Sequence, residues 1–162
     1  MMKKLKDFII QNLTHSRENL LTICDPLNDA ELAQIPPNCK YCIKALLIHI
    51  AETEEAWIEG VMLGGEYRYS ERFKLKWNEA ETSRLPSYKQ IREYLYEVRS
   101  NLVETLEELQ LYDFEDALRV FNTGKKVTVA DAVSHLQEHE LIHIGEIRLM
   151  VELLGKRPAE IE

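Results

Sequence analysis

Residues 128–155, TVADAVSHLQEHELIHIGEIRLMVELLG, decide how this chain folds. Thr128, with Asp131 three residues later, is a capping-box-like helix start in which Asp stands in the place of Glu. Gly155, followed by Pro158, marks the helix end. Apolar residues between these signals follow a helical period, and they are Val133, Leu136, Ile147, Met150 and Leu154. The stretch therefore predicts one long amphipathic helix that needs other helices to cover its apolar face.

Three further segments show the same helical period. They cover about residues 3–23, about residues 42–63, and a stretch that starts after Ser87 and reaches Leu109. The predicted apolar stripe of the first segment is Leu5, Phe8, Ile9, Leu13, Leu20 and Ile23. Between the last two helices, residues 119–129 (RVFNTGKKVTV) alternate around Asn-Thr-Gly, which predicts a short β-hairpin.

Four amphipathic helices of about twenty residues bury their apolar stripes most simply as a four-helix bundle. We therefore predict an all-α, single-domain protein over residues 1–162, with long connections and the short hairpin. A chain of this length can bury a core without disulfides or a structural metal.

The composition narrows the class of protein. Apolar residues make up 45% and charged residues 30% of the chain, as in ordinary soluble globular domains. The formal net charge of −8 argues against nucleic acid as a partner, because phosphate binding needs clustered Lys and Arg. The apolar run after the N-terminal lysines is too short for a signal peptide, and no run is long enough to span a membrane. An odd number of cysteines does not suggest a secreted disulfide framework, so we expect a cytoplasmic protein with reduced thiols.

The predicted last helix carries two histidines on its inward face. His139 and His143 are four residues apart, one above the other, and they continue the stripe of Leu136 and Ile147. A buried imidazole must satisfy two ring nitrogens without water, and a metal ion bound by both rings helps to do so. The alternative is a pair of core histidines that hydrogen-bond to polar neighbours. The His-Glu-x-x-His pattern also suggests a zinc protease, but Leu149 stands where the third histidine of a metzincin would be.

A third ligand is available on the predicted second helix. His49 lies within the inward stripe of that helix, beside Leu46 and Ile50. Metal sites in helical bundles are built from inward residues on facing helices. His49, His139 and His143 therefore predict a three-histidine site with open coordination positions, which is typical of catalytic rather than closed structural metal sites.

Two stretches of the sequence resemble a known family. Residues 42–55, CIKALLIHIAETEE, and residues 128–147, TVADAVSHLQEHELIHIGEI, resemble the DinB/YfiT-like metalloenzymes, and the likeness covers nearly the whole chain. Members of that family are four-helix bundles, often dimers, that bind a divalent metal through one histidine of the second helix and an H-x-x-x-H pair of the fourth. The resemblance implies the same three ligands here, His49, His139 and His143.

The resemblance also implies a function. Relatives include transferases that join a low-molecular-weight thiol, such as bacillithiol or mycothiol, to an electrophile, and a divalent metal keeps such a thiol nucleophilic at neutral pH. We therefore expect a metal-dependent thiol S-transferase that acts on a small molecule, forms a homodimer and uses zinc or nickel, with manganese and iron left open. The alternatives are a metal-dependent hydrolase and a non-catalytic, stress-related metal-binding or dimerisation module. The chain departs from the family pattern at Ile144, where Arg is common, and at Cys42, where Ser is common.

Further residues are candidates for roles around the metal. Glu140, next to His139, is a candidate general base or ligand-orienting carboxylate, and the alternative is a solvated helical residue. Candidates for a second layer around the ligands or for a pocket wall are His135, Glu52, Trp57 and Cys42. Cys42 also forms a C-x-x-C motif with Cys39, but a thioredoxin-like redox site needs a βαβ context that this sequence lacks.

Overall fold

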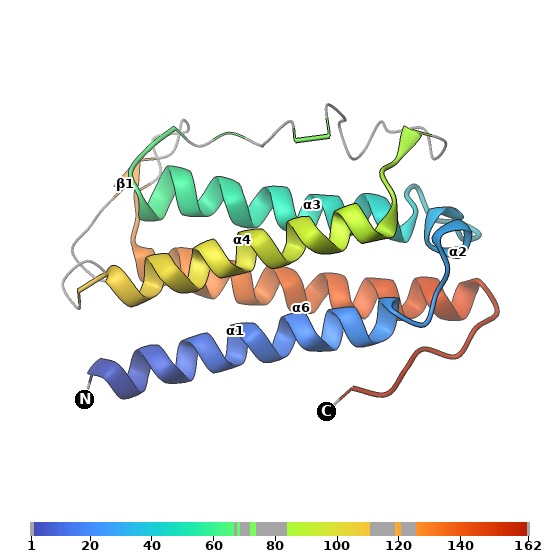
Figure 1. Cartoon of the computed structure of the whole chain (residues 1–162), viewed down its shortest axis with the longest axis horizontal. Helices are drawn as coiled ribbons and strands as arrows, with labels where there is room; N and C mark the ends of the chain where they lie inside the picture. Colours follow the sequence, from blue (N-terminus) through green and yellow to red (C-terminus); the bar gives the residue numbers. More distant parts are fainter. Residues whose placement is uncertain are drawn as a thin grey trace.

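The computed structural model describes residues 2–66, 68, 72–73, 84–110, 119–120 and 126–161. Four long helices lie side by side along the long axis of the molecule (Figure 1). They are α1 (Met2–Cys24), α3 (Ile43–Trp57), α4 (Tyr88–Glu108) and α6 (Val129–Leu153). The predicted all-α four-helix bundle is confirmed.

Smaller elements connect the long helices. The short helix α2 (Asp29–Ala33) precedes α3, and the π-helix η1 (Ile58–Met62) continues α3 without a break. Strand β1 (Arg119–Val120) pairs antiparallel with β2 (Lys126–Val127). This pairing confirms the predicted hairpin, whose turn lies outside the described residues. The helical period predicted neither α2 nor the change to a π-helix.

Side-chain caps fix where the later helices begin. The Thr128 side chain accepts a hydrogen bond from the Asp131 backbone N–H, and the Asp131 carboxylate accepts one from the Thr128 backbone N–H, as the sequence predicts. Ser87 caps α4 in the same reciprocal way with Gln90. Beyond the end of α6, Gly155 has a φ of +75°, the left-handed conformation in which glycine lets the chain leave the helix.

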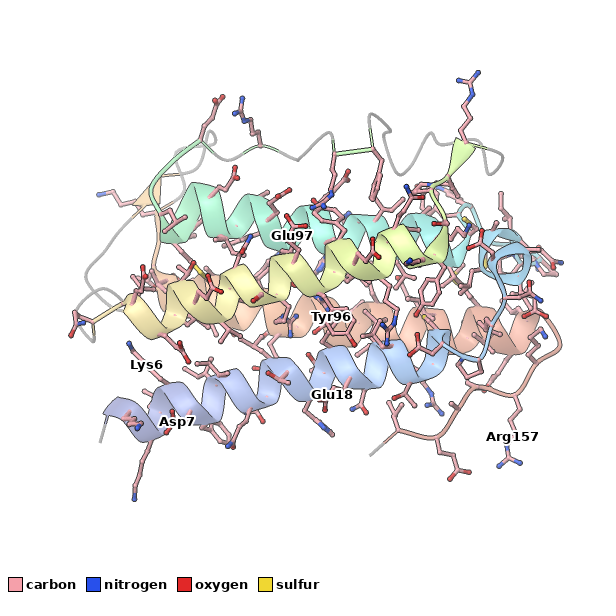
Figure 2. The ribbon with its side chains drawn as sticks, viewed as in Figure 1. Lys6, Asp7, Glu18, Tyr96, Glu97 and Arg157 are labelled. Atoms are coloured by element: carbon pink, nitrogen blue, oxygen red, sulfur yellow. The ribbon has the colours of Figure 1, made fainter. Side chains whose placement is uncertain are left out.

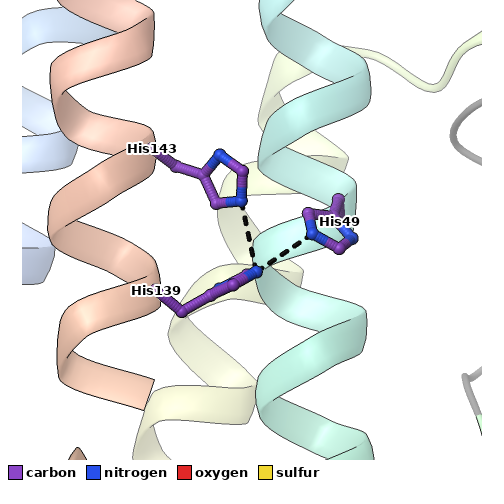
Figure 3. Close-up of side chains that lie close together, drawn as sticks. All are labelled: His49, His139 and His143. Carbon is purple, nitrogen blue, oxygen red and sulfur yellow. Dashed lines mark hydrogen bonds between the residues drawn. The ribbon is translucent and has the colours of Figure 1, made fainter. Parts of the chain in front are cut away.

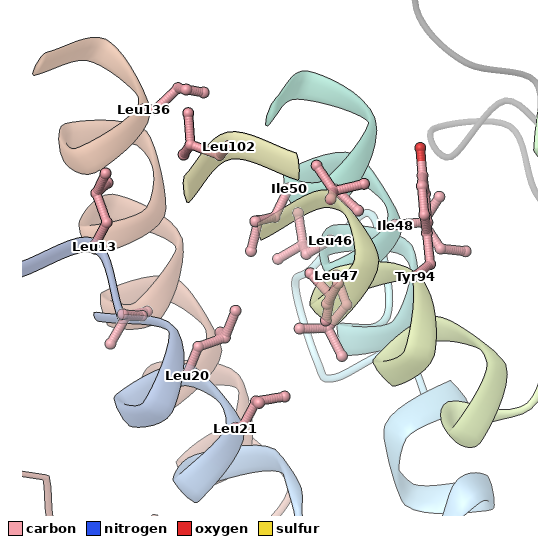
Figure 4. Packing of buried hydrophobic residues seen from close by; sticks show 14 of the residues in the cluster. Leu13, Leu20, Leu21, Leu46, Leu47, Ile48, Ile50, Tyr94, Leu102 and Leu136 are labelled. Atoms are coloured by element: carbon pink, nitrogen blue, oxygen red, sulfur yellow. The ribbon is translucent and has the colours of Figure 1, made fainter. Parts of the chain in front are cut away.

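The core lies between the four long helices, and α3 is buried on nearly all sides. Every residue of α3 except His49 and Glu55 is buried. The side chains packed together in Figure 4 include Leu13 and Leu20 of α1, Leu47 and Ile50 of α3, Tyr94 and Leu102 of α4, and Leu136 of α6. A helix buried this completely carries polar side chains only where they have partners inside the protein, so the polar residues of α3 point to function or to internal ion pairs.

The outer surface of the bundle carries charged side chains, among them Glu18 and Glu97 (Figure 2). The predicted apolar stripe of α1 is wrong at its start, because Leu5 is 51% exposed and Phe8 is 61% exposed. The first turns of α1 meet the end of α4 through Lys6 instead, whose ammonium group donates to a backbone carbonyl of α4 at 2.9 Å. No helix in the described part of the chain is both long enough and apolar enough to cross a lipid bilayer.

A buried ionic network lies in the centre of the bundle, and each long helix contributes one charged side chain to it. Arg17 of α1 lies 2.5 Å from Glu54 of α3 and 2.5 Å from Glu140 of α6. Arg99 of α4 lies 2.8 Å from Glu54 and 2.9 Å from Glu140. Each of the four side chains is at most 7% exposed. Because two guanidinium groups meet two carboxylates, the buried charges cancel and the four helices are tied to one another.

Candidate metal centre

Three histidines from two helices converge beside this core (Figure 3). His49 comes from α3, whereas His139 and His143 come from successive turns of α6. The His139 Nε2 atom lies 3.0 Å from His49 Nε2 and 3.2 Å from His143 Nε2. Among the residues that the structure describes, these three form the one group of potential metal ligands with such close spacing. The structure therefore brings together all three predicted ligands.

The spacing of the nitrogens fits a shared metal ion. Three nitrogens bound to one ion at about 2.0–2.1 Å lie about 2.8–3.0 Å apart on neighbouring octahedral positions and about 3.3–3.4 Å apart in tetrahedral geometry. The two Nε2–Nε2 distances to His139, 3.0 and 3.2 Å, lie at or between these values, and all three ligand atoms lie within 4.8 Å of one another. Without an ion, a close pair of imidazole nitrogens needs a proton between them, because two lone pairs repel each other. The three-histidine cluster can hold one divalent metal ion.

The protonation states of the histidines suit metal binding. Burial, together with the neighbouring His143, lowers the pKa of His49 from 6.5 to about 4. Burial also lowers the pKa of His139, to about 3, with added repulsion from His143, His49 and His135. Both rings are therefore neutral at pH 7, the form whose nitrogen lone pair binds a metal.

Two polar side chains lie next to the Nδ1 atoms of His143 and His49, the ring nitrogens that face away from the cluster. A Glu146 carboxylate oxygen lies 2.5 Å from His143 Nδ1, where it can accept a hydrogen bond from the ring. That bond places the proton on Nδ1 and leaves the His143 Nε2 lone pair facing His139. The Thr53 hydroxyl oxygen lies 3.4 Å from His49 Nδ1, where it can likewise accept a hydrogen bond from the ring. The sequence prediction missed the role of Glu146, although its position three residues after His143 on one helix face is a detectable signal.

Glu140, the predicted catalytic carboxylate, lies in the ionic network. Its carboxylate accepts hydrogen bonds from Ser16, Arg17 and Arg99, and it makes none to a histidine. Burial opposes the charged form, but the two arginines outweigh that effect and the pKa of Glu140 is lowered. The structure thus gives both carboxylate oxygens partners in the core and does not direct them toward the histidine nitrogens.

His135 and Trp57, both predicted near the metal, lie beside the ligands. The Trp57 and His135 rings are stacked with centroids 4.3 Å apart, and the His135 ring is stacked on His139 at 5.7 Å. His135 does not belong to the three-nitrogen cluster. The pair therefore forms one wall next to His139, with the indole buried and the imidazole toward solvent.

The two remaining predicted residues, Glu52 on α3 and Cys42 just before it, are buried. Glu52 is only 2% exposed, and its Oε1 atom has no hydrogen-bond partner within the described part of the chain. Burial, with repulsion from Glu55, raises the pKa of Glu52 to about 7. Cys42 stands at the N-terminal cap of α3, and burial raises the pKa of its thiol, which disfavours the thiolate needed for redox chemistry with Cys39.

A pocket of about 360 Å³ adjoins the histidines. His143 and Glu146 line it on the α6 side, and Cys39 and Tyr41 line it on the segment before α3. Ligand pockets in proteins have volumes of about 300–1,000 Å³, so this one is large enough for a small molecule. The three-histidine cluster and a pocket of small-molecule size therefore share one histidine.

Comparisons with known proteins agree with this architecture. A sequence profile of the DinB superfamily matches residues 12–147, a span that contains all three clustered histidines. The structure is similar to the crystal structure of a conserved protein from Enterococcus faecalis, with a TM-score of 0.73 and 14% sequence identity over 93% of this chain and 97% of that chain. At that identity the likeness supports the fold alone. No curated protein matches the sequence. Because the family profile spans most of the chain, this protein belongs to the DinB superfamily.

Proposed function

We propose that this protein is a metal-dependent transferase that joins a low-molecular-weight thiol, of the bacillithiol type, to an electrophilic small molecule. The observation that carries the proposal is the convergence of three histidine Nε2 atoms beside a pocket that His143 also lines. Three protein ligands leave coordination positions for a thiol or a substrate. Membership of the DinB superfamily supports metal binding at these residues.

His49, His139 and His143 would hold the metal. Imidazole ligands suit zinc, nickel, copper and iron alike, and we propose zinc or nickel. When bound, a divalent metal lowers the pKa of a thiol or water, so that the nucleophile is charged at neutral pH. The thiol sulfur forms a bond to the electrophilic carbon, and the displaced electron pair leaves with a halide, moves to the oxygen of an opened epoxide or moves to the far carbon of an activated alkene. The thiol proton passes to solvent or to the atom that receives that pair. Glu146 and Thr53 keep the ligand rings oriented throughout.

The runner-up is a metal-binding module without turnover. Its support is the buried ionic network, which makes the bundle a rigid support for the metal whether or not chemistry follows. The homodimer and the cytoplasmic location stay predictions of the sequence.

Metal content tests the first half of the proposal. The wild type, His49→Ala and His15→Ala would each be offered zinc and nickel, dialysed exhaustively and measured by elemental analysis. His15 is an exposed histidine on α1 outside the cluster, so its replacement is the matched control. We expect about one metal per chain in the wild type and in His15→Ala, and loss of the metal in His49→Ala. A wild type that retains no metal would contradict the proposal.

Thiol consumption tests the second half. The metal-loaded wild type would be assayed with cysteine-based thiols and a panel of epoxides, alkyl halides and activated alkenes, with His49→Ala and His15→Ala beside it. Turnover in the wild type and in His15→Ala, but not in His49→Ala, is the expected result. Stable metal binding without turnover of any pair would favour the module.

A further inference from the structure

The pocket beside His143 has a strongly apolar wall. Leu46 of α3 and Leu149 and Met150 of α6 line it, in addition to the groups named above. Leu149 is 56% exposed, although it borders a pocket that also contains His143. A lining of several apolar side chains with a few polar groups is typical of small-molecule pockets.

The volume limits what fits. An engineered apolar cavity of roughly 150 Å³ binds one benzene molecule. A pocket of about 360 Å³ therefore accommodates an aromatic ring or short alkyl chain together with a polar group. The apolar wall favours a ligand whose larger part is hydrocarbon.

The charged groups of the pocket determine the polar part of the ligand. The Glu146 carboxylate is 2.5 Å from His143 Nδ1 and is engaged with that ring. Lys40 also lines the pocket, and it forms no ion pair with any described residue. A lysine that has no ion-pair partner among the described residues attracts an anion to the edge of this apolar pocket, against the chain's net charge of −8.

We propose that this pocket binds a small apolar organic acid. Its hydrocarbon part lies against Leu46, Leu149 and Met150, and its carboxylate lies toward Lys40. If the pocket is the electrophile site of the transferase, the inference rests on the proposed function, because His143 would then bring the metal to one end of the ligand. The binding of apolar acids to the pocket does not itself depend on the metal.

The test uses the metal-free protein and 3-phenylpropionate as the probe, with affinity measured by calorimetry or by ligand-observed NMR. Two fragments separate the contributions: 3-phenylpropan-1-ol lacks the charge, and acetate lacks the ring. Wild-type protein should bind 3-phenylpropionate more tightly than either fragment. Equal binding of 3-phenylpropionate and acetate, or of the acid and the alcohol, would overturn the inference.

Variants locate the binding. Leu149→Asp places a charge on the apolar wall and should weaken the binding of 3-phenylpropionate by roughly tenfold or more. Leu153→Asp is the matched control, because Leu153 is also exposed on α6 but does not line the pocket. Lys40→Gln should weaken binding of the acid by about two- to fivefold and leave binding of the alcohol unchanged. Lys4→Gln, in the first turn of α1 and outside the pocket lining, should change neither.

The outcomes distinguish this inference from the proposed function. Equal effects of Leu149→Asp and Leu153→Asp would refute the pocket even if the protein binds metal and turns over a thiol. If the wild type keeps no metal in the dialysis experiment, the transferase is refuted, and selective binding of 3-phenylpropionate would still support the pocket.

Discussion

Replacing Glu140 with Gln should destabilise the protein severely, because it removes one charge from a buried network that is neutral. Both Glu140 oxygens accept hydrogen bonds, from Ser16, Arg17 and Arg99, and the carboxylate is 2% exposed. Glutamine has almost the same size, but its NH₂ group would face guanidinium donors and the network would keep one positive charge uncompensated. Breaking one partner of a buried ion pair costs about 3–5 kcal/mol. That loss is a large part of the total stability of about 5–15 kcal/mol that is typical of a domain.

Two matched variants separate the network from the metal. Glu54→Gln should cost a similar amount, since Glu54 bridges the same two arginines at 2.5 to 3.1 Å. Glu146→Gln changes a carboxylate on the same helix as Glu140, but Glu146 is half exposed and outside the network, so its cost should stay below about 1 kcal/mol. The comparison is made on metal-free protein, so that lost metal binding does not contribute.

Urea unfolding followed by far-UV circular dichroism measures the free energy of unfolding of each variant. The double variant Glu140→Gln/Arg99→Gln restores charge balance, so its cost should be smaller than the sum of the single costs by about 0.5–3 kcal/mol. The reasoning fails if Glu140→Gln costs less than about 1 kcal/mol while it abolishes turnover of the metal-loaded protein. That result would favour the original prediction that Glu140 is a general base.

Three further predictions concern the site itself. The folded protein holds a proton on Glu52 up to about pH 7, whereas the unfolded chain loses it near pH 4.5. The free energy of unfolding should therefore fall by about 3 kcal/mol as the pH rises from about 4.5 to about 7. Glu52→Gln should remove most of this fall when urea unfolding is measured across that pH range. Glu146→Gln should weaken zinc affinity by about 10- to 100-fold in chelator competition, and Glu152→Gln, an exposed acid on the same helix, should not change it. Zinc at a hundred times its dissociation constant should raise the free energy of unfolding by about 2.7 kcal/mol, and His139→Ala should lose that gain.

The sequence predicted the long helices well because their signals are local. The apolar period, the Ser87 and Thr128 caps and the glycine after α6 act within a few residues, and the structure has each of them. The three histidines were also predictable, because inward positions on facing helices of a bundle must meet. Leu5 and Phe8 followed the same period without being buried, since the pattern does not reveal where neighbouring helices end.

The sequence did not predict which side chains the carboxylates of α6 contact. Glu140 and Glu146 lie on one helix, six residues apart, and nothing local tells which meets arginines and which meets a histidine. The difference arises because α1 and α4 bring Arg17 and Arg99 to one side of α6 only. Such contacts depend on the relative rotation of four helices, which a single sequence does not specify.

The network and the metal site constrain the same helix rotations, because both take side chains from α3 and α6. Successive residues on an α-helix point about 100° apart, so the carboxylate of Glu140 and the ring of His139 face different neighbours. Turning α6 to carry His139 away from α3 would pull Glu140 from both arginines, at a cost of about 3–5 kcal/mol. Glu54 acts in the same way on α3, which carries His49. A bundle held by apolar contacts alone would tolerate small rotations at little cost, whereas paired buried charges oppose them, and three imidazoles can share one ion only if neither ligand-bearing helix turns.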